Sequence, residues 1–319
     1  MLPRLASKSI PYHAKRTAST SAKCALYVDR GILVANKPPG LVCQFDHSHS
    51  DPTTQRFAQF VNDLQQQAGI ASSTIDPVHR LDKTTTGSLA FGLSPHHTRE
   101  ISRQFRSREV KKTYLALVFG SSSAFATKTG TVREELRCID GRIELAKPTE
   151  SKKSSKDDVM WTKPAVTEWE IVASSTTAPL TLIRLHPQTG LKHQLRVHLA
   201  QCLSTPILGD TLYAHKEHWV GIAKKAGMPI NHVHLHASEL SFFRYRLTGA
   251  NRQVRIAVRA PLPHWFVHVC HGVGIQLHVD DLKGGLWVNG TKLRGGPLVE
   301  EDADAEAALE GVGGRWLGK

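Results

Sequence analysis

The chain has 319 residues, enough to bury a large core in one big domain or in two ordinary ones. Lys and Arg number 41 against 28 acidic residues, a formal net charge of +13, which favours a polyanionic partner such as nucleic acid but also allows a basic mitochondrial protein without RNA chemistry. Five scattered cysteines without a C-x-x-C pair argue against a disulfide framework and predict reduced thiols, and the absence of an apolar run of roughly 20 residues argues against a membrane span.

The N-terminal segment, residues 1–25, has the composition of a targeting sequence. Before Asp29 the chain contains five Lys or Arg residues, four serines and no acidic residue, which is typical of a mitochondrial transit peptide. We therefore expect a disordered basic targeting segment and a mitochondrial protein. The alternative is a disordered arm that contacts RNA in a cytoplasmic or nuclear protein.

The folded part is predicted to begin with a strand from Leu26 that leads into the turn-forming segment 37–40 (KPPG). Next comes an amphipathic helix that Asp51 caps and that ends at Gly69, because apolar side chains recur at helical spacing between them. A second helix is predicted to start at the cap Ser94. It is strongly basic and could lie beside a phosphate backbone.

Strands and helices alternate irregularly along the rest of the chain. Strands rich in β-branched or aromatic residues are expected at 88–93, 113–119, 167–173, 180–185 and 234–242. Because the strict alternation of a doubly wound sheet is missing, we expect an α+β fold with a mixed, mostly antiparallel central sheet flanked by helices.

The domain organisation predicted from composition is simple. Residues 26–270 are expected to form one catalytic domain, in which the polar segment 151–158 (SKKSSKDD) is a solvated loop. Residues 271–319 become glycine-rich and then acidic. We expect them to form a C-terminal appendage of uncertain order.

The first segment that indicates chemistry is a polar loop at 78–87 (VHRLDKTTTG), between two apolar stretches. Asp82 stands in it among basic and hydroxyl side chains, as a functional acid would. Taken alone, however, such a loop is more often a turn aspartate followed by a glycine.

The second segment runs from 185 to 200 (LHPQTGLKHQLRVHLA). Thr189 is predicted to cap a helix that places His193 and Arg196 on one face. That face could bring a guanidinium to a carboxylate elsewhere in the fold, although basic residues on a helix are more often only solvated.

Both segments resemble signature motifs of the RluA-type family of pseudouridine synthases. The family's H-R-L-D motif stands at 79–87, with Thr86 where serine is usual, and its T-G-x-x-H-Q-[IL]-R-V-H motif stands at 189–198, with Leu191 and Lys192 where arginine and threonine are common. Four further motifs, at 36–40, 112–118, 206–210 and 235–237, keep the family's order. Six motifs in order are not a plausible accident.

The resemblance implies that the chain isomerises uridine to pseudouridine in RNA without a cofactor. Asp82 matches the family's catalytic aspartate, through which the C1′–N1 bond breaks and C5 joins C1′, either by covalent addition or by removal of a ribose proton. Arg196 matches the arginine that pairs with this aspartate and keeps it ionised, a contact that can be bidentate. Tyr114 matches a tyrosine that can stack on uracil and assist the late proton transfer from C5, although a strand tyrosine alone would be assigned to the core.

Four more residues are candidates for substrate contacts. Arg80 matches a residue that fills the gap left when the target nucleotide leaves its stack, and His79 lies beside it. Leu199 is expected to pack near the pocket. Lys37 is a candidate for a phosphate contact.

Two other readings of the sequence carry less weight. His232, His234 and His236 alternate along one predicted strand, but no H-E-x-x-H motif or cysteine cluster accompanies them, so no metal is expected. A non-catalytic RNA-binding relative would not need the three catalytic candidates, all of which are present.

The RNA target is not fixed by the motifs. We expect ribosomal RNA, with transfer RNA as the alternative, and a monomeric enzyme. About 25 residues precede the predicted catalytic domain, too few for the S4-type module of many relatives. Target choice is therefore expected to come from the basic helix, the 151–158 loop and the C-terminal part.

Overall fold

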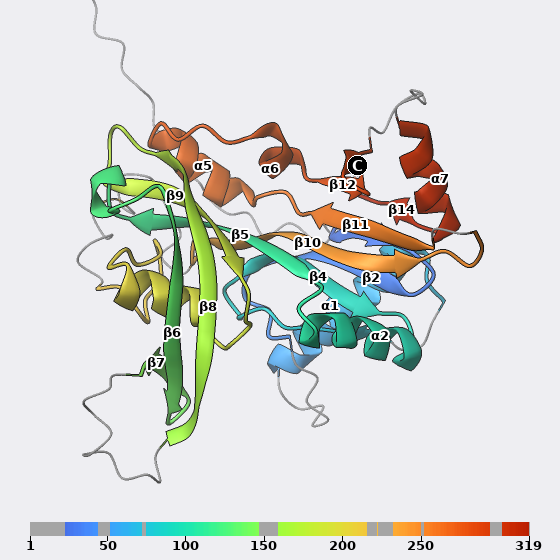
Figure 1. Ribbon diagram of the computed structural model, residues 1–319, viewed down its shortest axis with the longest axis horizontal. Coiled ribbons are helices and arrows are strands. Elements are labelled where there is room, and N and C mark those ends of the chain that lie inside the picture. The colour runs from blue at the N-terminus through green and yellow to red at the C-terminus, as the bar shows by residue number, and fades with distance from the viewer. Residues whose placement is uncertain are drawn as a thin grey trace, which may run out of the picture.

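The computed structural model describes residues 23–43, 52–71, 75–146, 159–215, 222, 232–249, 252–293 and 302–318. The cap predicted at Asp51, the loop predicted at 151–158 and all but the last three residues of the predicted targeting segment lie outside the described residues. The described part is an α+β fold built on one large sheet (Figure 1).

The strands are β1 (Ala25–Val28), β2 (Ile32–Lys37), β3 (Asp76–Pro77), β4 (Thr86–Gly92), β5 (Lys111–Phe119), β6 (Thr129–Ile139), β7 (Arg142–Leu145), β8 (Val159–Ser174), β9 (Leu180–Pro187), β10 (Leu235–Tyr245), β11 (Gln253–Arg259), β12 (Gly285–Val288), β13 (Thr291–Lys292) and β14 (Arg315–Trp316). They form one sheet in the order β14-β1-β2-β4-β10-β5-β9-β8-β6-β7, with β11 to β13 continuing from β10 and β3 pairing with β4. Among the described strand pairs only β4 and β10 run parallel. The predicted mixed, mostly antiparallel sheet is confirmed.

The first two predicted helices are also confirmed, as α1 (Pro52–Ala68) and α2 (Pro95–Arg106). Ser94 caps α2, because its side chain accepts a hydrogen bond from the backbone N–H of His97. Three later helices were not predicted: α5 (His264–Gly272), α6 (Val279–Lys283) and α7 (Ala303–Gly311).

The core lies on both faces of the sheet, because successive side chains of a strand point to opposite faces. In β2, Leu33 and Ala35 pack in one cluster with α1, whereas Ile32 and Val34 pack in another with α7. At the middle of the sheet, α5 covers β5 through Phe266. The central strands are therefore nearly continuous apolar runs, and they hold the polar loops at their ends rigidly.

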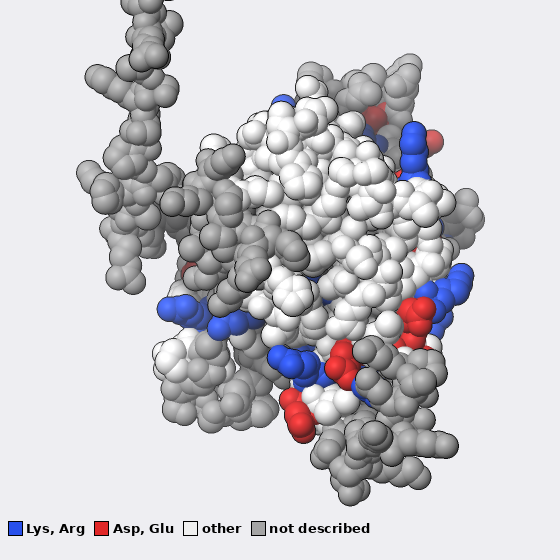
Figure 2. Space-filling view, turned by 90° about the vertical axis from the view of Figure 1, so that its left-hand side faces the viewer, with Lys and Arg blue, Asp and Glu red and all other residues white. Residues whose placement is uncertain are grey.

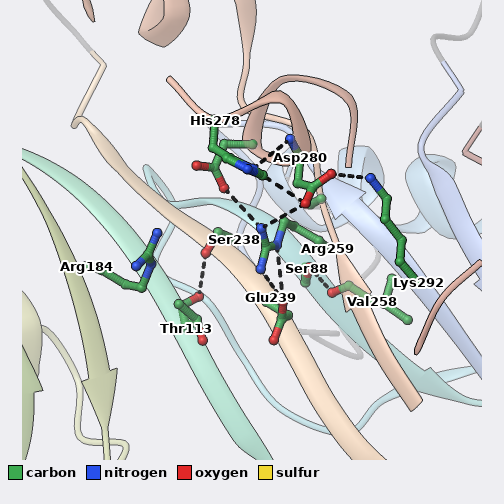
Figure 3. A network of polar contacts seen from close by, with 12 residues as sticks. Ser88, Thr113, Arg184, Ser238, Glu239, Val258, Arg259, His278, Asp280 and Lys292 are labelled. Atoms are coloured by element: carbon green, nitrogen blue, oxygen red, sulfur yellow. Dashed lines mark hydrogen bonds and ion pairs between the residues drawn. The ribbon is translucent and has the colours of Figure 1, made fainter. Parts of the chain in front are cut away.

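The segment expected to be a C-terminal appendage joins the same sheet in its described parts. β12 pairs with β11, and β14 pairs with β1. Figure 3 shows the polar contacts that fasten it: Arg259 on β11 donates to Glu239 on β10 and faces Asp280 on α6, which also binds Lys292 on β13. Asp280 and Lys292 lie on α6 and β13, which are too short to give a sequence pattern.

A buried carboxylate, Asp29, ties β10 to the turn between β1 and β2. Asp29 is 4% exposed and accepts hydrogen bonds from Arg244 at 2.8 Å, from the hydroxyl of Tyr27 at 2.8 Å and from two backbone N–H groups of the turn. Arg244 also donates to Glu100 on α2. The guanidinium thus joins β10, α2 and the first hairpin.

Replacing Arg244 with Met should lower the free energy of unfolding by about 3–5 kcal/mol, because Asp29 would stay buried without its cation. Urea unfolding followed by circular dichroism measures the change. The matched control is Arg103→Met, which removes an exposed ion pair with Glu109 at 3.6 Å and should cost less than about 1 kcal/mol. Similar small losses in both variants would contradict the importance assigned to the Asp29 contact.

Candidate active site

A cavity of about 300 Å³ lies between the two segments that carry the principal motifs. Asp82, Tyr114 and Arg196, the three predicted catalytic residues, all line it. A second cavity of about 220 Å³ shares Asp82, Arg196 and His193 with the first. The side chain of Asp82 is 21% exposed, so the carboxylate is accessible from the cavities yet surrounded by protein.

The loop that carries Asp82 is held by Lys37, the last residue of β2. The Nζ of Lys37 donates to the carbonyls of Pro38, Leu41 and Lys83 at 3.0, 3.2 and 3.3 Å. Burial lowers the pKa of Lys37 to about 8. The prediction that Lys37 contacts a phosphate is wrong, because its fully buried ammonium is bonded to three carbonyls. It positions the Asp82 loop instead.

Directly after this loop, β4 passes very close to β10. Gly87 has φ +108°, and a Cβ there would lie 2.2 Å from the carbonyl oxygen of Ala237, so only glycine fits. The hydroxyl of Thr86 lies 2.8 Å from Nδ1 of His236, whose Nε2 lies 3.2 Å from the carbonyl of Ala260. Because a carbonyl can only accept, Nε2 of His236 carries the proton and Nδ1 accepts from Thr86. The start of β4 is therefore fixed on two sides.

The second motif does not begin with the helix that the sequence predicted at Thr189. The helix α3 (Gln194–Val197) starts only after His193, which has the left-handed conformation with φ 54° and ψ 12°, and it continues as the π-helix η4 (His198–Cys202). The prediction that Thr189 is the N-cap is therefore wrong. The residues from Thr189 to His193 form a turn that carries polar side chains into the cavity.

The buried side chain of Gln194 holds this turn against β8. Its Oε1 accepts from the hydroxyl of Thr189 at 2.8 Å and from the backbone N–H of Leu191 at 3.1 Å. Its Nε2 donates to the carbonyl of Val166 at 3.1 Å and to the hydroxyl of Thr167 at 2.9 Å. Both N–H protons of the Gln194 amide are thus donated and its oxygen accepts two hydrogen bonds. This use of both ends of the amide explains why the motif has a glutamine at position 194.

Arg196 forms its bidentate contact with Asp210 and not with Asp82. Its Nε and Nη2 each donate to Asp210 at 2.7 Å, whereas Nη1 lies 3.6 Å from Oδ2 of Asp82. Burial alone would lower the pKa of Arg196, but the hydrogen bonds and the charge of Asp210 raise it. The guanidinium, which also lies over the ring of Tyr213 at 5.1 Å, is thus a fixed cation facing Asp82.

Asp210 and His193 were missed by sequence analysis, although both belong to matched motifs. Asp210 ends the segment 206–210, and nothing in a single sequence places it opposite Arg196. His193 was noted as a helix residue, but its Nε2 lies 3.9 Å from Oδ2 of Asp82 and its Nδ1 lies 2.9 Å from the hydroxyl of Tyr213.

Tyr114 on β5 and His79 form part of the cavity wall. Burial raises the pKa of Tyr114, so its hydroxyl stays protonated. The Nε2 of His79 accepts from the backbone N–H of Ala90 at 3.0 Å, and its ring stacks on Phe105 with centroids 4.7 Å apart. Burial lowers the pKa of His79 to about 3, so this ring is a neutral, apolar surface.

Arg80 and Lys112 supply positive charge at the cavity. Arg80 is exposed and lines both cavities. Lys112, not singled out by the sequence, donates to the carbonyl of Thr189 at 3.0 Å, and burial lowers its pKa to about 8.

Leu199 does not line either cavity. It is fully buried with Ile183 and Ile207, because the π-helix η4 turns it toward the sheet. Leu199 lies in one cluster with Leu195 and Leu235, which line the larger cavity, so it packs near the pocket as expected but supplies no wall for a direct substrate contact.

The histidines considered for a metal site are built into the core. His234 lies with Nδ1 3.1 Å from the carbonyl of Leu208 and with its ring 4.8 Å from that of Trp265. Within the described ranges, no three His, Cys, Asp or Glu side chains gather as metal ligands would. All five cysteines are free, and the described helices include none long and apolar enough to span a membrane.

Known proteins share both the sequence and the fold. The sequence profile of the RNA pseudouridylate synthase family matches residues 31–201. The dual-specificity RNA pseudouridine synthase RluA of Haemophilus influenzae is 34% identical over 192 residues, 60% of this chain and 77% of that protein. The human protein named Pseudouridylate synthase RPUSD4, mitochondrial, is 29% identical over 292 residues, 84% of this chain and 74% of that protein.

A solved structure supports the same relationship. Human RNA Pseudouridylate Synthase Domain Containing 4 has a TM-score of 0.58 at 26% identity, covering 80% of this chain and 94% of that one. The region matched by the family profile contains Asp82, Tyr114 and Arg196. The resemblance found in the motifs is confirmed, and the chain belongs to the RluA-type family of RNA pseudouridine synthases, isomerases that convert uridine to pseudouridine in RNA.

Proposed function

We propose that Asp82 is the essential catalytic carboxylate of this pseudouridine synthase, that Arg196 and Tyr114 act with it, and that its substrate is a mitochondrial ribosomal RNA. The observation that carries the assignment is the approach of a fixed guanidinium to an accessible carboxylate, 3.6 Å between Nη1 of Arg196 and Oδ2 of Asp82. The rest of the site supports this pair.

The chemistry requires an ionised carboxylate in a pocket that excludes water. Desolvation favours the neutral acid, and a nearby cation opposes it. Arg196 supplies that cation without a direct hydrogen bond, so both oxygens of Asp82 stay available to the target nucleotide. The carboxylate can then add to the nucleotide or remove a ribose proton.

Tyr114 is suited to the second half of the reaction. After C5 has joined C1′, C5 still carries the proton that must leave for the uracil ring to regain its conjugation. A phenol beside the uracil can stack on the ring and relay that proton, taking it from C5 while its own proton passes to N1, which needs one after the C1′–N1 bond has broken.

Arg80 and His79 are placed to replace the contacts that the target base loses. Taking a base out of its stack costs a few kcal/mol, which inserted side chains offset. The exposed Arg80 can fill the gap in the RNA, while the stacked pair of His79 and Phe105 offers a flat surface at the cavity wall.

The positive charge of the chain supports an RNA substrate, and its distribution favours binding around the cavity. Figure 2 shows one face of the molecule, on which broad areas carry neither Lys nor Arg and several of the basic groups lie beside acidic ones. Three basic residues gather at the site: Arg80 lines both cavities, Lys112 lines the first and Lys192 lines the second. Such a concentration would draw the phosphate backbone to the reacting end of the molecule.

Two observations support a mitochondrial location. The N-terminal composition is that of a transit peptide, and the human relative RPUSD4 carries the word mitochondrial in its name. Ribosomal RNA is the abundant structured RNA of that compartment. Transfer RNA is the alternative that the following experiment distinguishes.

Asp82→Asn should abolish the pseudouridine that the enzyme makes, because an amide can neither add to the nucleotide nor take a proton. Pseudouridines are mapped in mitochondrial and cytoplasmic RNA from cells with wild-type protein, with a deletion, and with the variant. A site lost in both altered strains identifies the substrate and the compartment.

The matched control is Asp63→Asn on α1, whose carboxylate accepts a hydrogen bond from Gln59 away from the cavities. It should leave every site modified. Persistence of all sites in Asp82→Asn cells at normal protein abundance would overturn the role of Asp82, and a site in transfer RNA alone would overturn the ribosomal assignment.

Tyr114→Phe should retain RNA binding and lower the single-turnover rate by about 10²–10⁴-fold, the usual contribution of a general acid or base. Tyr114→Leu should lose both rate and affinity, because it also removes the stacking ring. Filter binding and quenched-flow assays separate the two effects. Equal rates for Tyr114→Phe and wild type would exclude the hydroxyl from the chemistry.

A further inference from the structure

His193 combines three features that point to a specific task. Its backbone is held in the left-handed conformation, uncommon for residues with a side chain. Its side chain is 16% exposed and lines both cavities. Its Nε2 faces the carboxylate of Asp82, at 3.9 Å from Oδ2.

The hydrogen bonds of Tyr213 determine which nitrogen of a neutral His193 carries the proton. The hydroxyl of Tyr213 donates to the carbonyl of Ile143 at 3.0 Å, and this is its single proton. Nδ1 of His193, 2.9 Å from the same hydroxyl oxygen, must therefore be the donor of the second bond. Neutral His193 then bears its proton on Nδ1 and presents the lone pair of Nε2 to the cavity.

Neutral His193 is the form expected near pH 7. Burial lowers the pKa of His193, Asp82 raises it, and the cations Arg196 and Lys192 lower it. Asp210 raises it as well, but its carboxylate is bonded to Arg196. The net direction is downward from the usual value.

Two hydrogen-bond acceptors thus face each other, Nε2 of His193 and Oδ2 of Asp82. Neither the lone pair of Nε2 nor the ionised Oδ2 of Asp82 can satisfy the other. A donor on the bound substrate would satisfy both. An internal uridine of RNA offers only the 2′-hydroxyl and N3–H as donors.

The position of Asp82 selects between these donors. If Asp82 adds at C1′ or removes a proton from the ribose, its carboxylate lies beside C1′ or C2′ of the target. The 2′-hydroxyl is bonded to C2′, whereas N3–H is on the far side of the uracil ring. We propose that Nε2 of His193 accepts a hydrogen bond from the 2′-hydroxyl of the target uridine, with Tyr213 holding the required tautomer. This contact rests on the proposed role of Asp82 and makes His193 a residue that selects ribose over deoxyribose.

The tautomer is tested first, in the free full-length protein, by ¹H–¹⁵N correlation spectra of its histidine rings at pH 7.5. His193 should show a protonated Nδ1 and an unprotonated Nε2, with its signals identified by their loss in His193→Asn. In Tyr213→Phe the preference should shift toward protonated Nε2. A wild-type His193 protonated on Nε2 would overturn the proposal without reference to any RNA.

The contact itself is tested with a synthetic stem-loop that carries the uridine identified by the mapping, and with the same RNA bearing 2′-deoxyuridine at that position. His193→Asn tolerates the left-handed backbone and keeps an amide toward Tyr213, but it has no acceptor at the place of Nε2. It should lower the single-turnover rate or the affinity for the uridine RNA by about three- to tenfold, the effect of one neutral hydrogen bond.

With the deoxyuridine RNA, wild type and His193→Asn should be alike in rate and in dissociation constant, because the donor is already absent. His193→Gln, whose longer side chain restores an acceptor, should recover part of the loss on the uridine RNA. The control His268→Asn, at an exposed position on α5, should behave as wild type on both RNAs.

The outcomes separate this contact from the proposed function. A penalty of the same size on both RNAs would mean that His193 does not bind the 2′-hydroxyl and would overturn the proposal. If mapping finds no site that depends on Asp82, the proposed function fails, and the ring spectra still decide whether His193 has the tautomer that the contact requires.

Discussion

The guanidinium of Arg196 lies between two carboxylates, and the arrangement of the site depends on that geometry. Two of its nitrogens are bonded to Asp210, which fixes the plane of the group and leaves the third directed at Asp82. A cation bonded directly to the reactive carboxylate would hold its oxygens and reduce their reactivity. A cation fixed by a different acid can stabilise the charge of Asp82 while leaving its oxygens to the substrate.

The backbone around the site is fixed by polar side chains that, from the sequence alone, would be expected to contact solvent or substrate. Lys37 joins two loops through three carbonyls, and Gln194 uses its amide to attach a turn to β8. His236 spans from Thr86 to Ala260. Each is a polar group that is buried and satisfied, and each would be costly to leave unpaired. Such contacts hold Asp82 on a loop with the precision of a residue on a strand.

The sequence predicted the fold class, both early helices and five of the residues that line the larger cavity (His79, Arg80, Asp82, Tyr114 and Arg196), because these leave local signals. The spacing of apolar residues predicted α1, and the N-cap residue Ser94 predicted the start of α2. The motifs identified Asp82, Tyr114 and Arg196 as catalytic candidates. The sequence could not predict features that depend on the direction in which a side chain points or on contacts with residues far away in the chain. The ammonium group of Lys37 is buried, and nothing in the sequence around a lysine at the end of a strand indicates that its side chain points inward.

Errors at the second motif have the same origin. Thr189 is a good helix cap by composition, but its hydroxyl is bonded to Gln194, and the helix starts later. Leu199, which the helical spacing places inward, is indeed fully buried, and for that reason it lines neither cavity. The late strands β12 to β14 have at most four residues each, too few for alternation to be recognised, and they exist because earlier strands offer them partners.

The pairing of β14 with β1 has a consequence for the order in which the protein forms. Tyr27 and Val28 lie among the first residues described, yet their neighbours on one side are Trp316 and Arg315. Translation proceeds from the N-terminus, so this edge of β1 stays open until Trp316, almost 290 residues later, has been synthesised. An open edge is a template for wrong pairing, so the nascent chain carries this hazard until β14 covers β1.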